Sequence, residues 1–332
     1  MSMDAEQVVV IGGSAGAFEE LREILEALPA DLPAAVMAVM HLEPRAESQL
    51  PRALGRRAAL PVKFGEDGER VAAGAVYLAP PDRHILVRDG AVVLSSGPTE
   101  NYTRPAIDVL FRSAAVAFTG RCVGVLLSGQ NDDGADGLRI IAECGGAALV
   151  RDPAQTIFPR MPRAAQRVIS DAFVGEPAAI AKLIVEQLDR EREEGGACPP
   201  GLRDEVELTH QASHGCPPLP DQIGAQVPLA CPECGGPLWQ VGDPDHPRYR
   251  CHIAHAYTLD GLGEAQHREL TRALYAAQRM MRERARLLRR GGSASKRIDE
   301  YEGFAEELRA LLDRLVNDPP GDDTAESPVA AE

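Results

Sequence analysis

Short apolar runs alternate with amphipathic stretches along residues 6–190 of the chain. Runs such as QVVVIGG, AAVMAVMHL, CVGVLLSG and AALVRD have the length and composition of buried strands. Between them, AFEELREILEAL, AIDVLFRSAAVAF and GADGLRIIAECG have the apolar spacing of helices with one buried face. This alternation predicts an α/β fold, a doubly wound and mostly parallel sheet with helices on both faces. HILVRDGAVVLSS turns at Asp89-Gly90 and predicts one antiparallel hairpin in addition.

The pattern changes after residue 190, where REREEGGACPPGLRDE combines a charge run with a Gly/Pro cluster and predicts a linker. A short segment rich in Cys and His follows, and then two helical stretches over about 259–290 and 295–316, separated by GGSAS. The chain ends in an acidic segment that we expect to be disordered. The predicted organisation is a first domain over 6–190, a linker over 191–228, a zinc-ribbon-like module over 229–258, a helical hairpin over 259–317 and a tail over 318–332.

The charge of the chain narrows the classes of function. The 332 residues include 35 Lys and Arg against 50 Asp and Glu, a net charge of -15. This balance argues against general nucleic-acid binding, because neutralising phosphates requires a basic face. No apolar run approaches the roughly 18 residues of a membrane-spanning helix, and the N-terminus lacks the features of a signal peptide. We therefore expect a cytoplasmic protein with no membrane insertion.

Seven cysteines are too few and too unevenly spread for a disulfide framework. Cys122 and Cys144 lie in apolar segments, and we expect them to be buried thiols. The other five lie between residues 198 and 251, a skew that indicates a metal site in the C-terminal part of the chain.

The first predicted strand ends in GGSAG, a literal GxSxG motif with Ser14 at its centre. Between a strand and a helix, this motif is typical of a nucleophile held on a sharp turn, with the following backbone N–H groups facing an oxyanion. Phosphate or dinucleotide binding is an alternative, but GxGxxG needs glycine at position 14 and the Walker pattern needs a lysine. A purely structural turn is the third hypothesis.

A serine nucleophile needs a base, which a histidine oriented by a carboxylate can supply. His41 ends the second predicted strand, and a later strand is followed by three carboxylates, those of Asp132, Asp133 and Asp136. In an open parallel sheet, residues at these strand ends share the edge where ligands bind. Taken singly, the histidine could cap a strand, and the aspartates could belong to a helix-initiating turn. His84 precedes a strand, so we expect it to be structural or to support the site.

Six blocks then carry a family resemblance: VVVIGGSAGA, MHLEP, VYLAPPDRHILV, RPAIDVLFRSAA, VGVLLSGQNDDGADGL and IFPRMPRAA. In order and spacing they resemble the catalytic domain of CheB-type protein-glutamate methylesterases, over about residues 6–188. The resemblance implies a triad of Ser14, His41 and Asp133, the last being the aspartate directly before Gly134.

The same resemblance implies hydrolysis of glutamate γ-methyl esters on a receptor protein, through an acyl-serine intermediate and with release of methanol. It also implies deamidation of certain glutamines, and no cofactor for catalysis. Backbone N–H groups at Ala15 and Gly16 would bind the oxyanion, and Gln130 would lie on the active-site rim. Arg104 and Arg160 would line the surface that meets the protein substrate. The alternative for both arginines is a solvated rim.

The chain departs from the family pattern in two respects. Gln130 and Asn131 stand where the family has methionine and glycine in TGMG, so the rim is more polar and the choice of substrate is open. The strand that carries Ser14 begins within ten residues of the N-terminus. We therefore expect a stand-alone form without a receiver domain, and no control by aspartyl phosphorylation within the chain.

Two ligand pairs stand in CPECGGPLWQVGDPDHPRYRCHIAH. Cys231 and Cys234 form a CxxC, and Cys251 and His255 form a CxxxH, with sixteen residues between the pairs. This spacing predicts tetrahedral zinc, and four protein ligands leave no open position, so the zinc would be structural. His252 is the alternative to His255, and unpaired cytosolic thiols are the alternative to a metal site. RYRCHIAHAY also resembles tails attached to stand-alone members of the same esterase family.

The two C-terminal helices carry leucine, alanine and methionine at helical spacing, with arginines on another face of the first helix. They predict an antiparallel hairpin or a seam between copies of the chain. The arginines raise the alternative of nucleic-acid binding, whereas the net charge favours a solvated or salt-bridged face. The leading hypothesis is a methylesterase that acts on a methylated receptor or other signalling protein. The alternative is a non-hydrolytic docking or regulatory component of a signalling complex.

Overall fold

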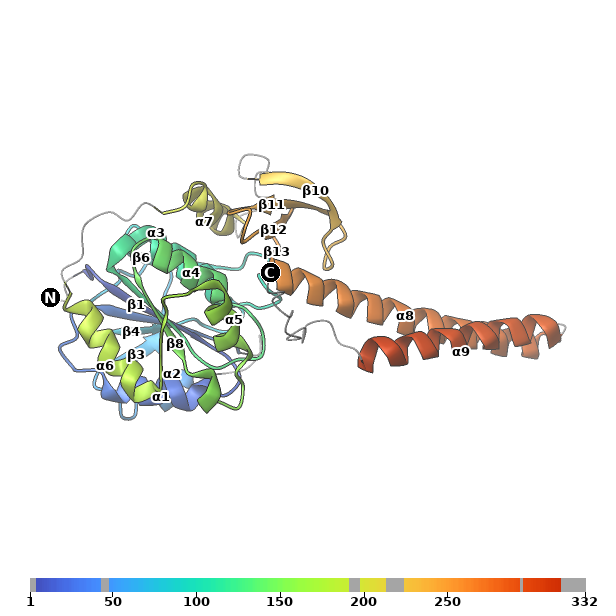
Figure 1. Cartoon of the computed structure of the whole chain (residues 1–332), viewed down its shortest axis with the longest axis horizontal. Coiled ribbons are helices and arrows are strands. Elements are labelled where there is room, and N and C mark those ends of the chain that lie inside the picture. Colours follow the sequence, from blue (N-terminus) through green and yellow to red (C-terminus); the bar gives the residue numbers. More distant parts are fainter. Residues whose placement is uncertain (1–3, 43–47, 191–197, 213–223, 293–294, 318–332) are drawn as a thin grey trace, which may run out of the picture. The chain divides into compact units, whose positions relative to one another are not determined.

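The computed structural model of the chain describes residues 4–42, 48–190, 198–212, 224–292 and 295–317 (Figure 1). The chain forms two compact units, Met1–Leu259 and Asp260–Glu332. The acidic tail predicted over 318–332 lies outside the described residues.

A seven-stranded sheet forms the centre of the first unit. Its neighbouring strands are all parallel, in the order β3-β4-β2-β1-β7-β8-β9. The strands are β1 (Val8–Gly13), β2 (Ala35–Met40), β3 (Val62–Phe64), β4 (Val76–Leu78), β7 (Cys122–Leu126), β8 (Ala147–Arg151) and β9 (Phe173–Gly175). This confirms the predicted parallel sheet. The strand order reverses at β1, which is the position where sheets of this kind bind ligands beyond the carboxyl ends of their strands.

Helices cover both faces of this sheet (Figure 1). Successive strand residues point to opposite faces, so Val10 of β1 packs in one hydrophobic core and Ile11 packs in the other. The first core is closed by α3 (Ile107–Phe118), α4 (Ala135–Glu143) and α5 (Arg160–Val168). The second is closed by α1 (Ala17–Ala27), α2 (Leu50–Leu54) and α6 (Pro177–Leu188). The doubly wound architecture is therefore confirmed.

The predicted hairpin consists of β5 (His84–Arg88) and β6 (Ala91–Ser95), which pair antiparallel apart from the main sheet. Its turn residues Asp89 and Gly90 have φ angles of 49° and 70°. Positive φ at both central residues is what a tight two-residue hairpin turn requires.

The stretch 191–228, expected to be a linker, contains the helix α7 (Leu202–Gln211). Leu202 packs in the first core, and the side chains of Glu205 and Thr209 are buried. The expectation that Cys144 is a free thiol was wrong, because it forms a disulfide with Cys198, just before α7. These two cysteines lie 54 residues apart, and the packing that brings them together has no local sequence signal.

The first unit also holds a four-stranded antiparallel sheet in the order β10-β11-β12-β13. Its strands are β10 (Gly224–Ala230), β11 (Pro237–Val241), β12 (Arg248–Cys251) and β13 (Ala256–Thr258). We call residues 224–258 the Cys/His module. Trp239, the single tryptophan of the chain, is buried in this module.

The second unit contains most of α8 (Leu259–Arg290) and all of α9 (Ser295–Asn317), close to the predicted bounds. The two helices run antiparallel (Figure 1). An ion pair of 2.8 Å joins Arg289 to Glu302 near the turn, and Ala285, Ile298 and Ala305 are buried between the helices. Among the described helices, none has the length and apolar character needed to cross a membrane.

Candidate functional site

Ser14 lies directly after β1, in a sharp turn that leads into α1. Its backbone N–H donates to the Ser128 carbonyl (2.9 Å), and its own carbonyl accepts from the Ala17 N–H (3.1 Å). Gly16 has a φ of 82°, and a Cβ there would lie 2.7 Å from the Phe158 ring, so the turn requires glycine at this position. The predicted context of strand, turn and helix is therefore present.

A partly buried carboxylate, that of Glu20, holds the Ser128 side of this turn. Glu20 of α1 accepts from the Ser128 N–H (3.0 Å) and from Ser128 Oγ (2.6 Å), and Arg151 Nε donates to the same carboxylate (3.0 Å). These contacts hold Ser128 in the position where its carbonyl accepts from the Ser14 N–H. This contact could not be predicted from the sequence, because Glu20 belongs to a helix that carries other charged residues.

His41 follows β2, the parallel neighbour of β1. The register pairs Gly13 with Met40, and the His41 N–H donates to the Gly13 carbonyl (3.2 Å). Ser14 and His41 therefore occupy equivalent positions at the carboxyl ends of adjacent strands, as the sequence pattern predicted.

Of the three candidate carboxylates, Asp133 is the one in contact with His41, and its Oδ2 lies 2.8 Å from Nε2 of the imidazole. The Asp133 side chain is fully buried, whereas the imidazole is 12% exposed. Asp132 instead accepts from the Thr258 hydroxyl, and Asp136 pairs with Arg139 and Arg248. Their spacing in the sequence did not show which of the three aspartates meets His41, whereas their contacts in the fold do.

Donors surround the Asp133 carboxylate on every side. The backbone N–H groups of Ile107 (2.7 Å) and Asp108 (3.2 Å), in the first turn of α3, donate to it, as do the side chains of Asn101 (3.3 Å) and Thr103 (3.3 Å). Burial would raise the pKa of Asp133, but the hydrogen bond and charge of His41 and these backbone donors bring it below its usual value. The helix N-terminus favours the same charged form.

Asp108 lies beside Asp133 and behaves in the opposite way. Burial, and then the neighbouring charge of Asp133, raise the pKa of Asp108 well above its usual value. Its Oδ1 accepts from the N–H groups of Gly134 (3.1 Å) and Gly137 (2.7 Å), which fixes the turn that carries Asp133. Two adjacent carboxyl groups are thus driven apart in pKa, and the negative charge is held on the one that meets His41.

His84 is fully buried, as its expected structural role requires. Its Nε2–H donates to the Pro98 carbonyl (2.9 Å), and its Nδ1 accepts from the Ala106 N–H (3.2 Å). Both ring nitrogens are used by the backbone, and burial lowers the pKa of the imidazole.

Gln130, predicted on the active-site rim, and Arg104 and Arg160, predicted on the substrate surface, differ in their exposure and contacts. Gln130 and Arg160 are exposed. The Arg104 guanidinium donates to Asp82 (2.6 Å) and to the Gly97 carbonyl (2.7 Å), so it also fixes the loop before α3.

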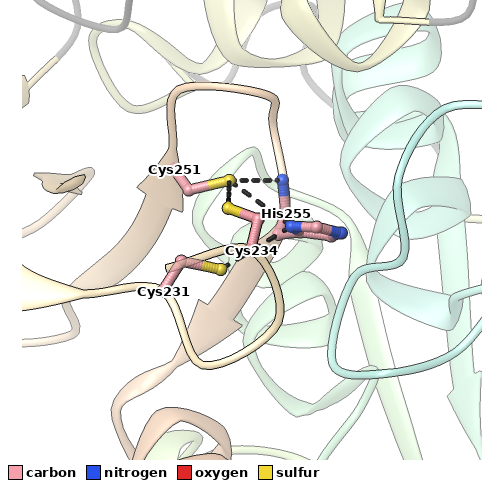
Figure 2. Close-up of side chains that lie close together, drawn as sticks. All are labelled: Cys231, Cys234, Cys251 and His255. Atoms are coloured by element: carbon pink, nitrogen blue, oxygen red, sulfur yellow. Dashed lines mark hydrogen bonds between the residues drawn. The ribbon is translucent and has the colours of Figure 1, made fainter. Parts of the chain in front are cut away.

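The four predicted ligand residues of the Cys/His module lie together (Figure 2). Cys231 and Cys234 occupy the turn between β10 and β11, and Cys251 and His255 flank the connection between β12 and β13. Their ligand atoms all lie within 4.8 Å of one another. His252 does not join them, because its ring packs against Gly236, where a Cβ would lie 2.1 Å away.

The separations within this group fit a tetrahedral zinc site. Sγ of Cys234 lies 3.7 Å from Sγ of Cys251, and Nδ1 of His255 lies 3.5 Å from Sγ of Cys251 and 3.6 Å from Sγ of Cys231. Ligands at about 2.3 Å for sulfur and about 2.0 Å for nitrogen would be roughly 3.5–3.8 Å apart in a tetrahedron. The donor set and the spacing both suit this metal.

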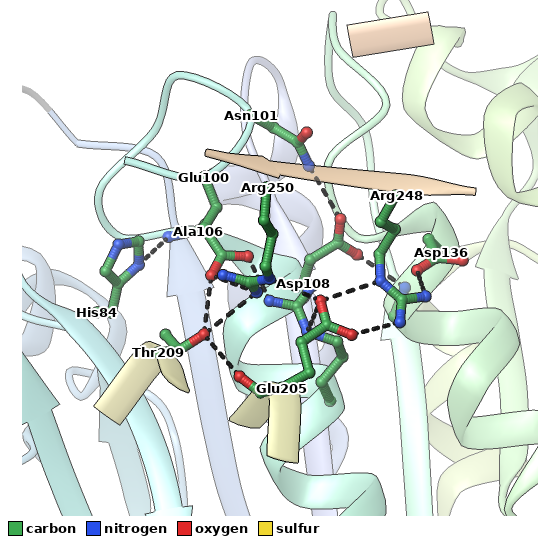
Figure 3. A network of polar contacts seen from close by, with 12 residues as sticks. His84, Glu100, Asn101, Ala106, Asp108, Asp136, Glu205, Thr209, Arg248 and Arg250 are labelled. Atoms are coloured by element: carbon green, nitrogen blue, oxygen red, sulfur yellow. Dashed lines mark hydrogen bonds and ion pairs between the residues drawn. The ribbon is translucent and has the colours of Figure 1, made fainter. Parts of the chain in front are cut away.

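A buried ion cluster attaches the Cys/His module to α3, α4, α7 and the loop of Glu100 (Figure 3). It combines three arginines with three carboxylates: Arg112, Arg248, Arg250, Glu100, Asp136 and Glu205. Arg250 of β12 lies 2.9 Å from Glu100 and 2.9 Å from Glu205 of α7, and Arg248 lies 2.8 Å from Asp136 of α4. The charges balance, so each buried ion has a partner of opposite sign.

This cluster is expected to make the folding stability fall in acid. Burial by itself would raise the pKa of Glu100, but the charges of Arg112 and Arg250 lower it to about 2. Because the usual value is 4.5, Glu100 contributes stability that is present above that pH and is lost as the pH falls toward 2. The difference between the two pKa values corresponds to on the order of 3 kcal/mol.

Urea unfolding followed from about pH 6 down to about pH 3 measures this dependence. Glu100→Gln is expected to be less stable at neutral pH and to lose less stability on acidification. An acid dependence as steep in this variant as in the wild type would contradict the assignment to Glu100.

Known proteins resemble the first part of the chain. A Xanthomonas oryzae protein named protein-glutamate methylesterase/protein-glutamine glutaminase 2 is 40% identical over 167 residues, which are 49% of this chain and 46% of that relative. A Leptospira interrogans protein, provisionally given the same activities in its name, is 36% identical over 180 residues, which are 54% of this chain and 93% of that relative. This chain therefore spans about half the length of the first relative and nearly all of the second.

A solved structure agrees with these relatives. The crystal structure of the Thermotoga maritima CheB methylesterase catalytic domain matches with a TM-score of 0.52 and 30% identity, and the match covers 54% of this chain and 97% of that domain. Residues 9–184 match the family described as CheB methylesterase. This match spans the sheet, Ser14, His41 and Asp133, and the chain therefore belongs to the CheB methylesterase family.

Proposed function

We propose that the chain hydrolyses glutamate γ-methyl esters on chemoreceptor-like signalling proteins in the cytosol, and that it also deamidates glutamine side chains. The names of the relatives support both activities. The observation that carries the proposal is the contact of 2.8 Å between His41 and the buried Asp133, at the strand end next to Ser14. A base oriented by a carboxylate beside a serine on a sharp turn is the arrangement that acyl transfer requires.

In the proposed reaction, Ser14 Oγ attacks the ester carbonyl while its proton moves to His41. Nε2 of His41 faces Asp133, so Nδ1 is the atom that takes this proton. The charge of Asp133 stabilises the imidazolium. The N–H groups of Ala15 and Gly16, which precede α1 and so have no helical acceptor, would bind the oxyanion.

Collapse of the tetrahedral intermediate breaks the bond to the methoxy oxygen, which leaves as methanol with the proton from His41. Water then attacks the acyl-serine with His41 as its base, which releases the glutamate side chain and restores Ser14. A glutamine side chain would follow the same path with ammonia as the leaving group. On the rim, Arg160 and Gln130 are exposed, and Arg104 donates to Asp82.

Asp133→Asn is expected to lower kcat for methanol release from a methylated receptor by about 10,000-fold. Every neighbour of this carboxylate donates a hydrogen bond, so a buried amide NH₂ would face another donor whichever way it turned. His41 would then lose the tautomer in which Nδ1 accepts the serine proton. Methanol release from methylated receptor fragments, with unmethylated fragments as a blank, measures the effect.

Asp132→Asn is the matched control, since its carbonyl can still accept from Thr258 and it does not contact His41. We expect this neighbour to keep most of the activity. If Asp133→Asn and Asp132→Asn were equally active, the proposed triad would be wrong. If the wild type released no methanol, the proposed esterase function would fail.

We further propose that Cys231, Cys234, Cys251 and His255 bind one structural zinc ion. The separations and donor types described above support this ligand set. When bound, the metal would supply a crosslink between the two turns of the module and no reactive chemistry, because four protein ligands leave no position for water.

The helical hairpin is proposed to join copies of the chain. Large apolar side chains stay exposed along both of its helices, and they support this proposal: Leu270, Tyr275, Met280, Leu287, Phe304, Leu311 and Val316. Burying such residues between copies would remove them from water.

A further inference from the structure

Asn101 lies between the proposed triad and the Cys/His module. Its side chain is 7% exposed. Nδ2 donates to Asp108 (2.9 Å) and to Oδ1 of Asp133 (3.3 Å), the carboxylate that meets His41. On the other side, Oδ1 of Asn101 accepts from the backbone N–H of Thr258, the last residue of β13 (3.1 Å). One buried amide therefore contacts both the active site and the module.

The contact with Thr258 determines which way this amide points. An N–H donor on one side and two carboxyl groups on the other fit a single orientation, with the oxygen toward Thr258 and the NH₂ toward Asp133. The flipped amide would place its oxygen against both carboxyl groups and its NH₂ against the Thr258 N–H. The donor from β13 adds to this preference, because it gives the amide oxygen a partner on the side away from the two carboxyl groups.

The backbone of Asn101 is held by the same strand. Its N–H donates to the Ala256 carbonyl (2.9 Å), and Glu100 forms a parallel bridge with Ala256. Asn101 has a φ of 48°, a conformation that asparagine tolerates better than most residues. The side chain of Glu100 lies in the buried ion cluster (Figure 3). Backbone and side-chain contacts therefore both hold Glu100 and Asn101 in place.

We propose that Asn101 is a positioning residue for Asp133, and that β13 of the Cys/His module holds it in its working orientation. The module is distant in sequence from Ser14 and His41, and it thereby completes the support of the active site. Loosening the module lowers the rate of the chemical step. This inference rests on the proposed esterase function. It extends that function by making residues 256–258 part of the supporting structure of the site.

Asn101→Gly tests the role of the amide without straining the backbone, because glycine adopts positive φ freely. We expect kcat for methanol release to fall by about 10- to 100-fold, the factor for one hydrogen bond to a charged group, with KM unchanged. Asn101→Asp keeps the shape and the tolerance of positive φ but replaces two donors by a charge beside Asp133. Its kcat should fall further than that of Asn101→Gly.

Thr258 tests the link to the module. Thr258→Pro removes the N–H that orients Asn101, and Thr258→Ala keeps it. We expect a fall in kcat for the proline variant that approaches that of Asn101→Gly, and a much smaller change for the alanine variant. The fluorescence of Trp239, buried in β11, reports whether the module stays folded in each variant.

The outcomes separate the two proposals. An inactive wild type would overturn the esterase function itself. If the wild type is active and Asn101→Gly keeps the wild-type kcat, or differs from the wild type only in KM, the positioning role is overturned. If Thr258→Pro unfolded the module, the comparison of Asn101→Gly with Asn101→Asp would still decide the role of the amide.

Discussion

Ser14→Ala is expected to lower methanol release by about a million-fold, leaving only the residual rate that oxyanion donors and substrate binding provide. The reason is that this variant removes the attacking atom while the base, its carboxylate and the turn stay in place. Ser14 contributes its backbone N–H to the Ser128 carbonyl and its own carbonyl to the Ala17 N–H, and alanine keeps both contacts. The fold should therefore be retained, and the loss should lie in kcat.

Ser128→Ala is a matched control for this variant. It removes a hydroxyl that donates to Glu20 of α1 and contacts the Thr156 hydroxyl, and it keeps the carbonyl that accepts from the Ser14 N–H. We expect its activity to stay within about 10-fold of the wild type, the cost of one hydrogen bond.

Ser14→Ala also separates the enzyme from the non-hydrolytic alternative. A wild type that releases methanol, together with a Ser14→Ala variant that binds the methylated receptor but releases none, would support the esterase. Wild type and Ser14→Ala that both bind the receptor and both fail to release methanol would favour a docking component instead.

Cys231→Ser is expected to abolish zinc binding and to unfold the Cys/His module. A module of residues 224–258 is too small to fold on apolar burial alone, and zinc binding worth about 10–16 kcal/mol would supply much of its folding free energy. Metal analysis should give about one zinc per wild-type chain and none in the variant. The emission of Trp239 should shift to longer wavelength as the indole becomes exposed to water, and a strong chelator should cause the same shift in the wild type.

The two histidines of the module provide the sharpest control. His255→Ala should lose zinc, whereas His252→Ala should keep it, because the His252 ring packs on Gly236 outside the group. If His255→Ala retained zinc and His252→Ala lost it, His252 would be the ligand in place of His255. Full metal content in Cys231→Ser would refute the ligand set as a whole.

The sequence predicted the parts of the fold that depend on local patterns. Apolar runs of strand length gave the strands of the parallel sheet, and Asp89-Gly90 gave the hairpin turn. The proximity of His41 and Asp133 followed from strand ends that share one edge of a parallel sheet. These inferences need only the identity of neighbouring residues and the geometry of regular elements.

Contacts between distant segments were not predictable in this way. Arg250 and Glu100 are separated by 150 residues, and RYRC was interpreted only as part of a metal motif. The charge run and the Gly/Pro cluster of REREEGGACPPGLRDE predicted a linker, yet Glu205 of α7 is buried because two arginines of β12 neutralise it. Asn101 belongs to no motif that we recognised. Its proposed role depends on its contacts with β13 and Asp133, which only the fold shows.

The buried ion cluster limits how freely this chain can be recombined with its relatives. A transplant of β10–β13 without α7 would carry Arg248 and Arg250 away from Glu205, leaving two cations without their shared counterion. A fragment cut at residue 190 would keep Arg112 and Glu100 but lose the segments that shield them from water. A chimera with a relative should therefore exchange the whole stretch up to Leu259. A crossover near residue 190, after the parallel sheet, would break the ion cluster.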